Sequence, residues 1–321
     1  MITYYVQRDG VTERLDKIDS DWLRPGSGVL VWADVQVPSQ EDGIVLRDVF
    51  NLHPIAVQDA LDLLQRPKVE TYPDLLYVVL HGINFKSATD EFTTHDTDFF
   101  LSREFLVTVH DGQRRSIEEI CKLCLANKGV MREGTVALMH RIVDRMVDHY
   151  RPSVDELELR LNEIEDAVIE TPSNELTRQI LTIKRDISAM RRIVLPQRDV
   201  VGRLSRREFE VIDQEMSYRF RDVFDQLARM SDDAIIFQER VTGILDAHLT
   251  SVSNQLAAVS KVLAALAVIL GPLTIVTGAF GMNVLLPVLP GGERAQFWWV
   301  VGGMGIITGS AYYTFRRKGW L

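Results

Sequence analysis

The residues best suited to chemistry are Gly281, Met282 and Asn283, which follow an apolar run at 262–280. That run has no Asp, Glu, Lys, Arg or His, so only hydroxyl groups, glycines and the backbone are available there to meet an ion. An amide oxygen, such as that of Asn283, can accept hydrogen bonds from the water around a cation. This chemistry suits Mg²⁺, which gives up its hydration shell reluctantly. Because a single amide would do little, the hypothesis requires several copies of the chain.

Small residues recur at helical spacing before this tripeptide. The stripe consists of Ser260, Ala264, Ala267, Gly271, Thr274, Gly278 and Gly281. One interpretation is tight helix packing through small side chains. The other is a symmetric pore lined by this face, in which neutral oxygens and dewetting constrictions set selectivity and gating. The spacing alone leaves both open.

Two C-terminal segments have the length of membrane spans. The runs at 262–280 and 297–315 each contain 19 residues without a charge, and as helices each would extend about 28 Å, close to the thickness of a bilayer core. Basic residues lie outside the two runs: Lys261 precedes the first, and Arg316, Arg317 and Lys318 follow the second. The loop between the runs has a single basic residue, Arg294. The positive-inside rule therefore predicts that both termini are cytoplasmic. The N-terminus has no signal-peptide pattern, so about 260 residues are expected in the cytoplasm.

Charge and composition argue against other classes of protein. The net charge of −9 disfavours nucleic acid as a partner and suits a protein that meets cations. An acidic run at 155–170 is typical of a solvated helix face, with a loose cation-attracting surface as the alternative. No phosphate-binding glycine-rich loop is present.

Two further motifs could bind metal, and neither predicts an enzyme. Cys121 and Cys124 form a lone CxxC in a helix-like segment, which favours reduced thiols over a zinc or redox site. The sequence His-Asp-Thr-Asp at 95–98 would alternate between the two faces of a strand, so we interpret it as a polar strand end.

The elements that must position these residues fall into several segments. Up to residue 132, strands are predicted at 28–33, 75–81, 99–101 and 105–109, with a helix at 54–64. From residue 134 the pattern is helical, with a hairpin of arms at 136–170 and 174–204. One helix of more than sixty residues is predicted at 217–280; it would be about 95 Å long and would need partners along its length.

The fold class expected is an α+β membrane protein. It combines a cytoplasmic α/β domain, a long helical hairpin, a stalk helix and two C-terminal transmembrane helices. The predicted boundaries are 1–132 for the α/β domain, 133–216 for the hairpin, 217–261 for the stalk, 262–283 for the first span, 284–296 for the outer loop, 297–315 for the second span and 316–321 for the basic tail.

The order of these features resembles the CorA superfamily of divalent-cation channels. Gly281-Met282-Asn283 ends the first of two C-terminal spans, and a short loop, a second span and a basic tail follow. Segments 52–60 (LHPIAVQDA) and 66–70 (RPKVE) resemble the N-terminal signature of the family, and 245–254 resembles its stalk.

This resemblance implies a homopentameric funnel in a bacterial or archaeal inner membrane, with a filter at Gly281, Met282 and Asn283. Positions that face the pore in the family correspond here to Asn254, Leu263, Gly271 and Thr274, and the small stripe adds Gly278. It also implies that Asp246 shares a regulatory metal site with an acidic residue of the neighbouring subunit, for which Asp90 is the candidate. Intracellular Mg²⁺ bound there would hold the pore shut.

Some positions depart from the family pattern. The first carboxylate after Asn283 is Glu293, ten residues later, and Ala257 stands where well-known members have an amide. The outer loop and the segment 195–199 (LPQRD) resemble the zinc-transporting branch. Transport of Mg²⁺, with Co²⁺ and Ni²⁺, is the main prediction. A Zn²⁺ transporter and a poorly conducting membrane regulator or scaffold are the alternatives.

Overall fold

The computed structural model of the chain describes residues 1–62, 65–86, 91–112, 114–126, 129–170, 173–282 and 292–320. The chain divides into two compact units. Unit 1 comprises Met1–Ile169 and Ser173–Ile244, and unit 2 is built on Leu245–Leu321.

Unit 1 is organised around a seven-stranded sheet with the order β2-β1-β3-β7-β6-β5-β4 among the described residues. Its strands are β1 (Ile2–Arg8), β2 (Val11–Leu15), β3 (Leu30–Gln36), β4 (Lys68–Tyr72), β5 (Leu75–Lys86), β6 (Glu91–Leu101) and β7 (Phe105–His110). Neighbouring strands are antiparallel, except that β3 and β7 are parallel. These two strands are central, and every residue of β7 is buried, as expected for a strand that is covered on both faces.

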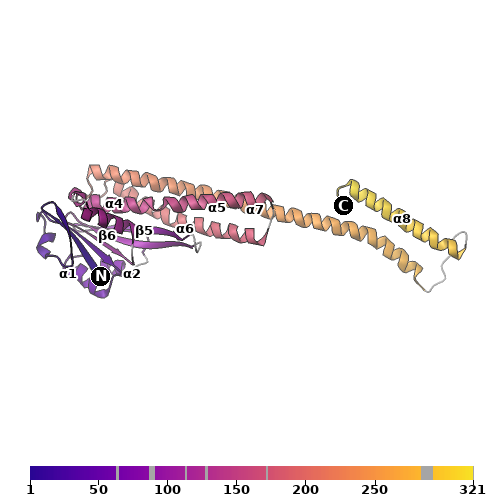
Figure 1. Cartoon of the computed structure of the whole chain (residues 1–321), viewed down its shortest axis with the longest axis horizontal. Coiled ribbons are helices and arrows are strands. Elements are labelled where there is room, and N and C mark those ends of the chain that lie inside the picture. Colours follow the sequence, from indigo (N-terminus) through magenta and orange to yellow (C-terminus); the bar gives the residue numbers. More distant parts are fainter. Residues whose placement is uncertain are drawn as a thin grey trace. The chain divides into compact units, whose positions relative to one another are not determined.

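Helices cover both faces of this sheet (Figure 1). On one face lie α1 (Gln40–Asp48) and α2 (Pro54–Asp62), and side chains such as Leu46 and Val57 join the core formed with β3 and β7. On the other face, α4 (Thr135–Asp148) contacts β5, β6 and β7. The helix α3 (Arg115–Ala126) and short 3-10 turns at Ser20–Leu23 and Val130–Glu133 complete this part.

Three long helices form the rest of unit 1: α5 (Arg151–Glu170), α6 (Asn174–Ser205) and the first part of α7 (Gln214–Phe280). Their apolar side chains recur at helical spacing and are buried between the helices, for example Leu157, Leu161, Ile180, Ile187, Leu227 and Val241. Polar contacts add to this packing, since Arg160 pairs with Asp186 at 3.1 Å and Arg191 donates to Gln238 at 2.5 Å.

Several sequence predictions are confirmed and others need correction. The helices predicted at 174–204 and 217–280 are present as α6 and α7. The predicted strands at 75–81 and 105–109 lie in β5 and β7, whereas β3 starts and ends later than predicted and β6 begins eight residues earlier. Strands β1, β2 and β4 were not predicted. The helix predicted at 54–64 is α2, which ends at Asp62; residues 63–64 lie outside the described residues.

The prediction of one continuous helix over 136–170 is wrong. The chain breaks at His149 and Tyr150, between α4 and α5. Pro152 lies just after the break and has no N–H to continue the helical hydrogen bonds. Tyr150 is fully buried and donates a hydrogen bond to the carbonyl oxygen of His81 in β5. The break therefore anchors the helical part of unit 1 to the sheet.

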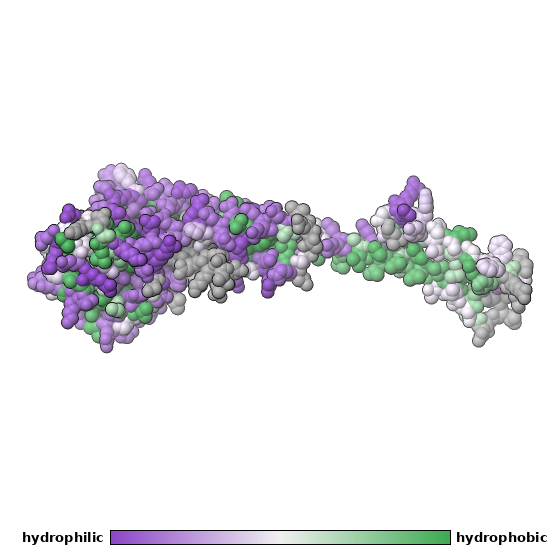
Figure 2. Space-filling view, viewed as in Figure 1, coloured by the Kyte–Doolittle hydropathy of each residue, from purple (hydrophilic) through white to green (hydrophobic). Residues whose placement is uncertain are grey.

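Unit 2 contains α7 from Leu245 onward and α8 (Glu293–Arg317). Hydrophobic residues dominate the surface of this part of α7 (Figure 2). Within the described part of the chain, α7 is the one helix that is long and apolar enough to cross a membrane, and almost none of its most apolar window is buried. The second predicted span lies in α8, which is helical but does not meet the same criterion.

Candidate ion pathway on helix α7

The C-terminal part of α7 presents neutral oxygen atoms without charged side chains. The Thr274 hydroxyl donates to the carbonyl oxygen of Leu270 at 2.9 Å, and the Thr277 hydroxyl donates to that of Leu273 at 2.9 Å. Each hydroxyl hydrogen is thus used inside the helix, while lone pairs on the oxygen stay available. These side chains can therefore accept hydrogen bonds from water, as the hydration shell of a cation would require.

The small residues do lie on one side of α7. At about 100° per residue, the stripe from Ser260 to Gly281 occupies an arc of about 100°. Leu263 lies at the edge of this arc and is 60% exposed. By the same geometry Asn254 lies about 80° beyond the arc. Helical geometry thus groups Leu263, Gly271, Thr274 and Gly278 on one face and leaves Asn254 apart.

The glycines of this stripe differ in what the single chain demands of them. A Cβ atom at Gly281 would lie 3.0 Å from the carbonyl oxygen of Thr277, which itself accepts a hydrogen bond from the Gly281 N–H at 2.9 Å. A side chain at 281 would therefore be crowded against the backbone where the helix ends. A Cβ atom at Gly271 or Gly278 would meet nothing within 4 Å. The described chain therefore has room for a side chain at both positions.

The predicted filter is only partly described. Met282 is 61% exposed, and its N–H donates to the carbonyl oxygen of Ala279 at 3.4 Å. Asn283 lies outside the described residues. The contribution of its amide stays a prediction.

The predicted regulatory metal site cannot be formed by the described residues of one chain. Asp246 is exposed on α7, and its carbonyl oxygen accepts a hydrogen bond from the Thr250 hydroxyl at 2.8 Å. Among the described residues, no group of three or more His, Cys, Asp or Glu side chains could hold a metal ion. Asp90 lies outside the described residues. A metal at Asp246 would need ligands from elsewhere, such as another subunit.

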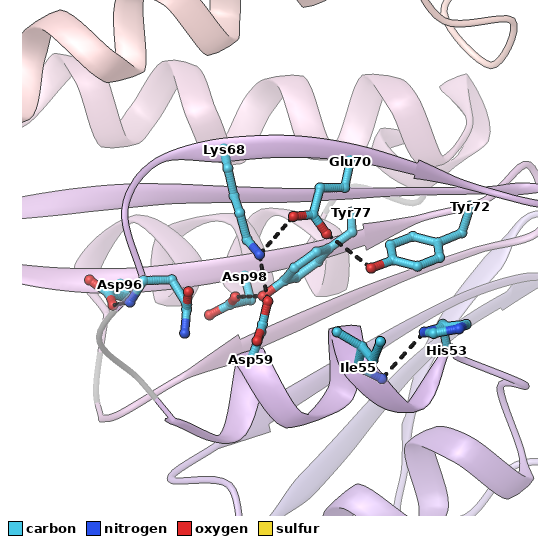
Figure 3. A network of polar contacts seen from close by, with 10 residues as sticks. His53, Ile55, Asp59, Lys68, Glu70, Tyr72, Tyr77, Asp96 and Asp98 are labelled. Atoms are coloured by element: carbon cyan, nitrogen blue, oxygen red, sulfur yellow. Dashed lines mark hydrogen bonds and ion pairs between the residues drawn. The ribbon is translucent and has the colours of Figure 1, made fainter.

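The N-terminal signature forms an ion-pair cluster that sequence reasoning missed (Figure 3). The Lys68 ammonium on β4 pairs with Asp59 of α2 at 2.5 Å and with Glu70 at 2.9 Å, and the Tyr72 hydroxyl donates to Glu70 at 2.9 Å. These contacts connect α2 to the edge strand of the sheet. The spacing of Lys68 and Glu70, two residues apart on one strand face, was a usable signal. Their partner Asp59 could be found only from the fold.

The two other candidate metal motifs are buried or partly buried. Asp96 and Asp98 share one face of β6, as the alternation predicted, but they are 8% and 1% exposed in the sheet interior. The interpretation of this segment as a polar strand end is wrong, because β6 continues to Leu101. Burial raises the pKa of the Cys121 and Cys124 thiols to about 12, so both are protonated at neutral pH and are poor metal ligands.

The fold matches known metal transporters over the whole chain. The complete structure of the CorA magnesium transporter from Methanocaldococcus jannaschii aligns with a TM-score of 0.86 and 23% identity, covering 100% of this chain and 99% of that chain. The chain thus has the same fold as that protein along its whole length.

Sequence comparison identifies the family. The family model for CorA-like Mg²⁺ transporter proteins matches residues 27–317. The chain therefore belongs to the CorA superfamily of divalent metal transporters, a family of membrane transporters rather than enzymes. The cobalt/magnesium transport protein CorA of Thermotoga maritima is 28% identical over 278 residues, covering 85% of this chain and 78% of that protein. The zinc transport protein ZntB of Pectobacterium carotovorum is 24% identical over 260 residues, covering 80% and 77%.

Proposed function

We propose that the chain forms a homopentameric channel that passes hydrated Mg²⁺, and also Co²⁺ and Ni²⁺, into the cytoplasm down its electrochemical gradient. Intracellular Mg²⁺ bound at Asp246 closes this channel. The protein spans the inner membrane of a bacterium or archaeon twice, at 262–283 and 297–315, with both termini in the cytoplasm.

One observation carries this proposal. The apolar part of α7 has a face of small residues on which Gly271 and Gly278 have open space around them. A face without bulky side chains, repeated around a common axis, can surround a cation together with its water. Hydroxyl oxygens such as that of Thr274 supply acceptors for that water.

Mg²⁺ is favoured over Zn²⁺ by the ligands available. Zn²⁺ prefers thiolate and imidazole ligands, and the run at 262–280 has neither Cys nor His. A Zn²⁺ transporter remains the second candidate, because the similarity to a zinc transport protein covers most of the chain. The late first carboxylate at Glu293 supports a third candidate, a poorly conducting regulator.

Ion flux into liposomes tests the proposal. Purified full-length protein is reconstituted, and uptake of Mg²⁺, Co²⁺, Ni²⁺ and Zn²⁺ is followed with indicator dyes, with and without a pH gradient. We expect uptake of Mg²⁺ above that of empty vesicles. Absence of uptake for all four ions, or a lone monomer in native mass spectrometry, would refute the channel.

A matched pair of variants separates a pore face from a packing face. Gly278→Leu adds a bulky group to the small stripe, where the chain itself has room for it. Val276→Leu is the control, since it lies at nearly the same depth but about 160° around the helix. A pore face predicts that Gly278→Leu blocks flux while the oligomer stays intact. If Gly278→Leu instead dissociates the oligomer, the stripe serves packing; if it changes neither property, the stripe has no role.

A further inference from the structure

A buried carboxyl group in unit 1 lacks the partners that an ionised acid needs. Asp98 lies within β6 and is 1% exposed. Its Oδ1 atom accepts a hydrogen bond from the Tyr77 hydroxyl at 2.5 Å (Figure 3). Its Oδ2 atom is buried and has no hydrogen-bond partner within the described part of the chain. In this environment a carboxylate is far more costly than a protonated carboxyl group.

The nearest cation is held by other acids. Lys68 Nζ forms its ion pairs with Asp59 and Glu70, and it lies 5.1 Å from the centroid of the Tyr77 ring. The hydroxyl of that same ring is bonded to Asp98. The Tyr77 side chain therefore links the Lys68 ammonium group to the Asp98 carboxyl group, a third acid that could compete for Lys68.

Several elements bring titratable groups toward Asp98. These groups are Asp59 from α2, Lys68 and Glu70 from β4, Tyr77 and His81 from β5, and Asp96, which pairs with His81, from β6. Burial opposes ionisation of Asp98 most strongly, and the charges of Asp96 and Asp59 oppose it further. The Tyr77 hydrogen bond and Lys68 favour the ionised form. Together these effects raise the pKa of Asp98 to about 7. The group therefore changes charge near neutral pH.

The acids around Lys68 differ in how well water can reach them. The Asp59 side chain is 26% exposed, so solvent can stabilise its charge if it loses the lysine. The Asp98 side chain is buried and has no such substitute. Glu70 is on the same strand as Lys68 and also accepts from Tyr72. Once Asp98 is ionised, Asp59 is thus the partner that Lys68 can leave at least cost.

We propose that Asp98 is a proton-operated switch that sets how firmly α2 is held to β4. When the Asp98 carboxyl group releases its proton to solvent, the new charge draws the Lys68 ammonium away from Asp59, and the tie between α2 and the edge strand weakens. When the proton returns, Lys68 resumes its pairing with Asp59.

The change would extend beyond β4. The Arg203 guanidinium of α6 donates to the carbonyl oxygen of Val69, the second residue of β4, at 3.3 Å. Movement of β4 would thus act on α6, which packs along α7 in unit 1 through contacts such as Arg191 to Gln238. The switch does not depend on ion transport, so its test uses a structural readout.

Hydrogen exchange measured by mass spectrometry on the full-length protein in micelles tests the switch. Protection of residues 54–62 and 68–72 is compared at about pH 6 and about pH 8, after correction for base-catalysed exchange. We expect protection of 54–62 to fall about fivefold at the higher pH, as for loss of one partly exposed ion pair. In Asp98→Asn, protection should be the same at both pH values.

Controls make the outcome decisive. Asp62→Asn removes an exposed charge from the same helix, where Asp62 bonds only to Gln58 in the described structure, and should keep the wild-type response. Tyr77→Phe removes the hydrogen bond that favours the ionised acid, so the transition should shift to higher pH. A wild-type protein without a pH response, or Asp98→Asn and Tyr77→Phe variants with the wild-type midpoint, would overturn the proposal. Because Tyr77→Phe is nearly isosteric, it serves if Asp98→Asn fails to fold.

Discussion

Replacing Asp98 by Asn should change how the stability of unit 1 depends on pH. The two side chains have nearly the same shape, and the amide oxygen of Asn can still accept the hydrogen bond from Tyr77. The variant differs in one respect that matters here, because it cannot ionise. Any pH dependence that the substitution removes therefore belongs to the Asp98 carboxyl group and its coupling to neighbouring charges.

The size of this effect follows from the pKa. Burial first, and the nearby acids after it, raise the pKa of Asp98 from its ordinary value of 3.8 to about 7 in the folded chain. The folded state thus holds the proton more tightly than the unfolded state, and this contribution to stability is fully present below the ordinary pKa and is lost as pH rises to about 7. The difference in pKa corresponds to about 4 kcal/mol, of which about 3 kcal/mol falls between about pH 5 and about pH 8.

Other acids require that wild type and variant be compared directly. Burial acts to raise the pKa of Glu119, but its hydrogen bond to Arg115 and the nearby cations lower it overall. The pKa of Glu133 is lowered chiefly by its hydrogen bond to Arg219. The contributions of these two acids to folding stability therefore grow as pH rises from acid values. They are common to both proteins. We therefore expect the unfolding free energy of wild type minus that of Asp98→Asn to fall by about 3 kcal/mol from about pH 5 to about pH 8.

The natural cysteines provide the assay. The chain has two cysteines, Cys121 and Cys124, both on α3 of unit 1. Cys124 is fully buried, so a thiol reagent labels it only when this unit opens. Pulse labelling of the full-length protein in increasing urea, with Cys124 quantified by mass spectrometry, yields the unfolding free energy at each pH. A constant difference between the two proteins over this range would refute the assignment of a raised pKa to Asp98.

Three further predictions concern the pathway and the fold. Asn283→Ala should abolish Mg²⁺ uptake while native mass spectrometry still shows the oligomer, and wild-type uptake would contradict a filter role. Asp246→Ala should leave channels conducting at millimolar internal Mg²⁺, whereas unchanged inhibition would exclude Asp246 from the regulatory site. Gln197→Leu removes the buried hydrogen bonds to Tyr150 (2.7 Å) and to the His81 N–H (3.0 Å), and should destabilise unit 1 by about 2 kcal/mol in the labelling assay. A loss below about 0.5 kcal/mol would show that this network contributes little.

Sequence reasoning succeeded where one periodicity dominates a long segment. The helix α6 was predicted because apolar residues recur at helical spacing, and α7 because the segment 217–280 has few glycines and no proline before Pro272. It failed at the edges of the sheet, where β2 (VTERL) and β4 (KVETY) carry charged residues and lack a clear hydrophobic run. Such residues protect an edge strand from pairing with other chains, but they also make it look like a loop.

Parts of the candidate sites depend on contacts that no local pattern contains. The cluster around Lys68 joins an acid on α2 to residues on β4, and the pairing exists only because the fold brings these elements together. The burial of Asp98 likewise follows from the position of β6 inside the sheet, between β5 and β7. Local sequence showed that acids alternate there, yet it could not show that they are enclosed.

The arrangement of side chains on α7 bears on what surrounds it. Its exposed apolar residues differ in size around the helix, with small residues gathered in one arc and Leu263 at the edge of that arc. Bulky side chains such as Val262, Leu266 and Phe280 lie about 110° to 150° from the centre of the arc of small residues on an ideal helix. Lipid chains have no reason to favour one size on one side, whereas a neighbouring helix or a pore does. The open space that the chain leaves at Gly271 and Gly278 would allow further copies of α7 to approach the small side, as the proposed channel requires.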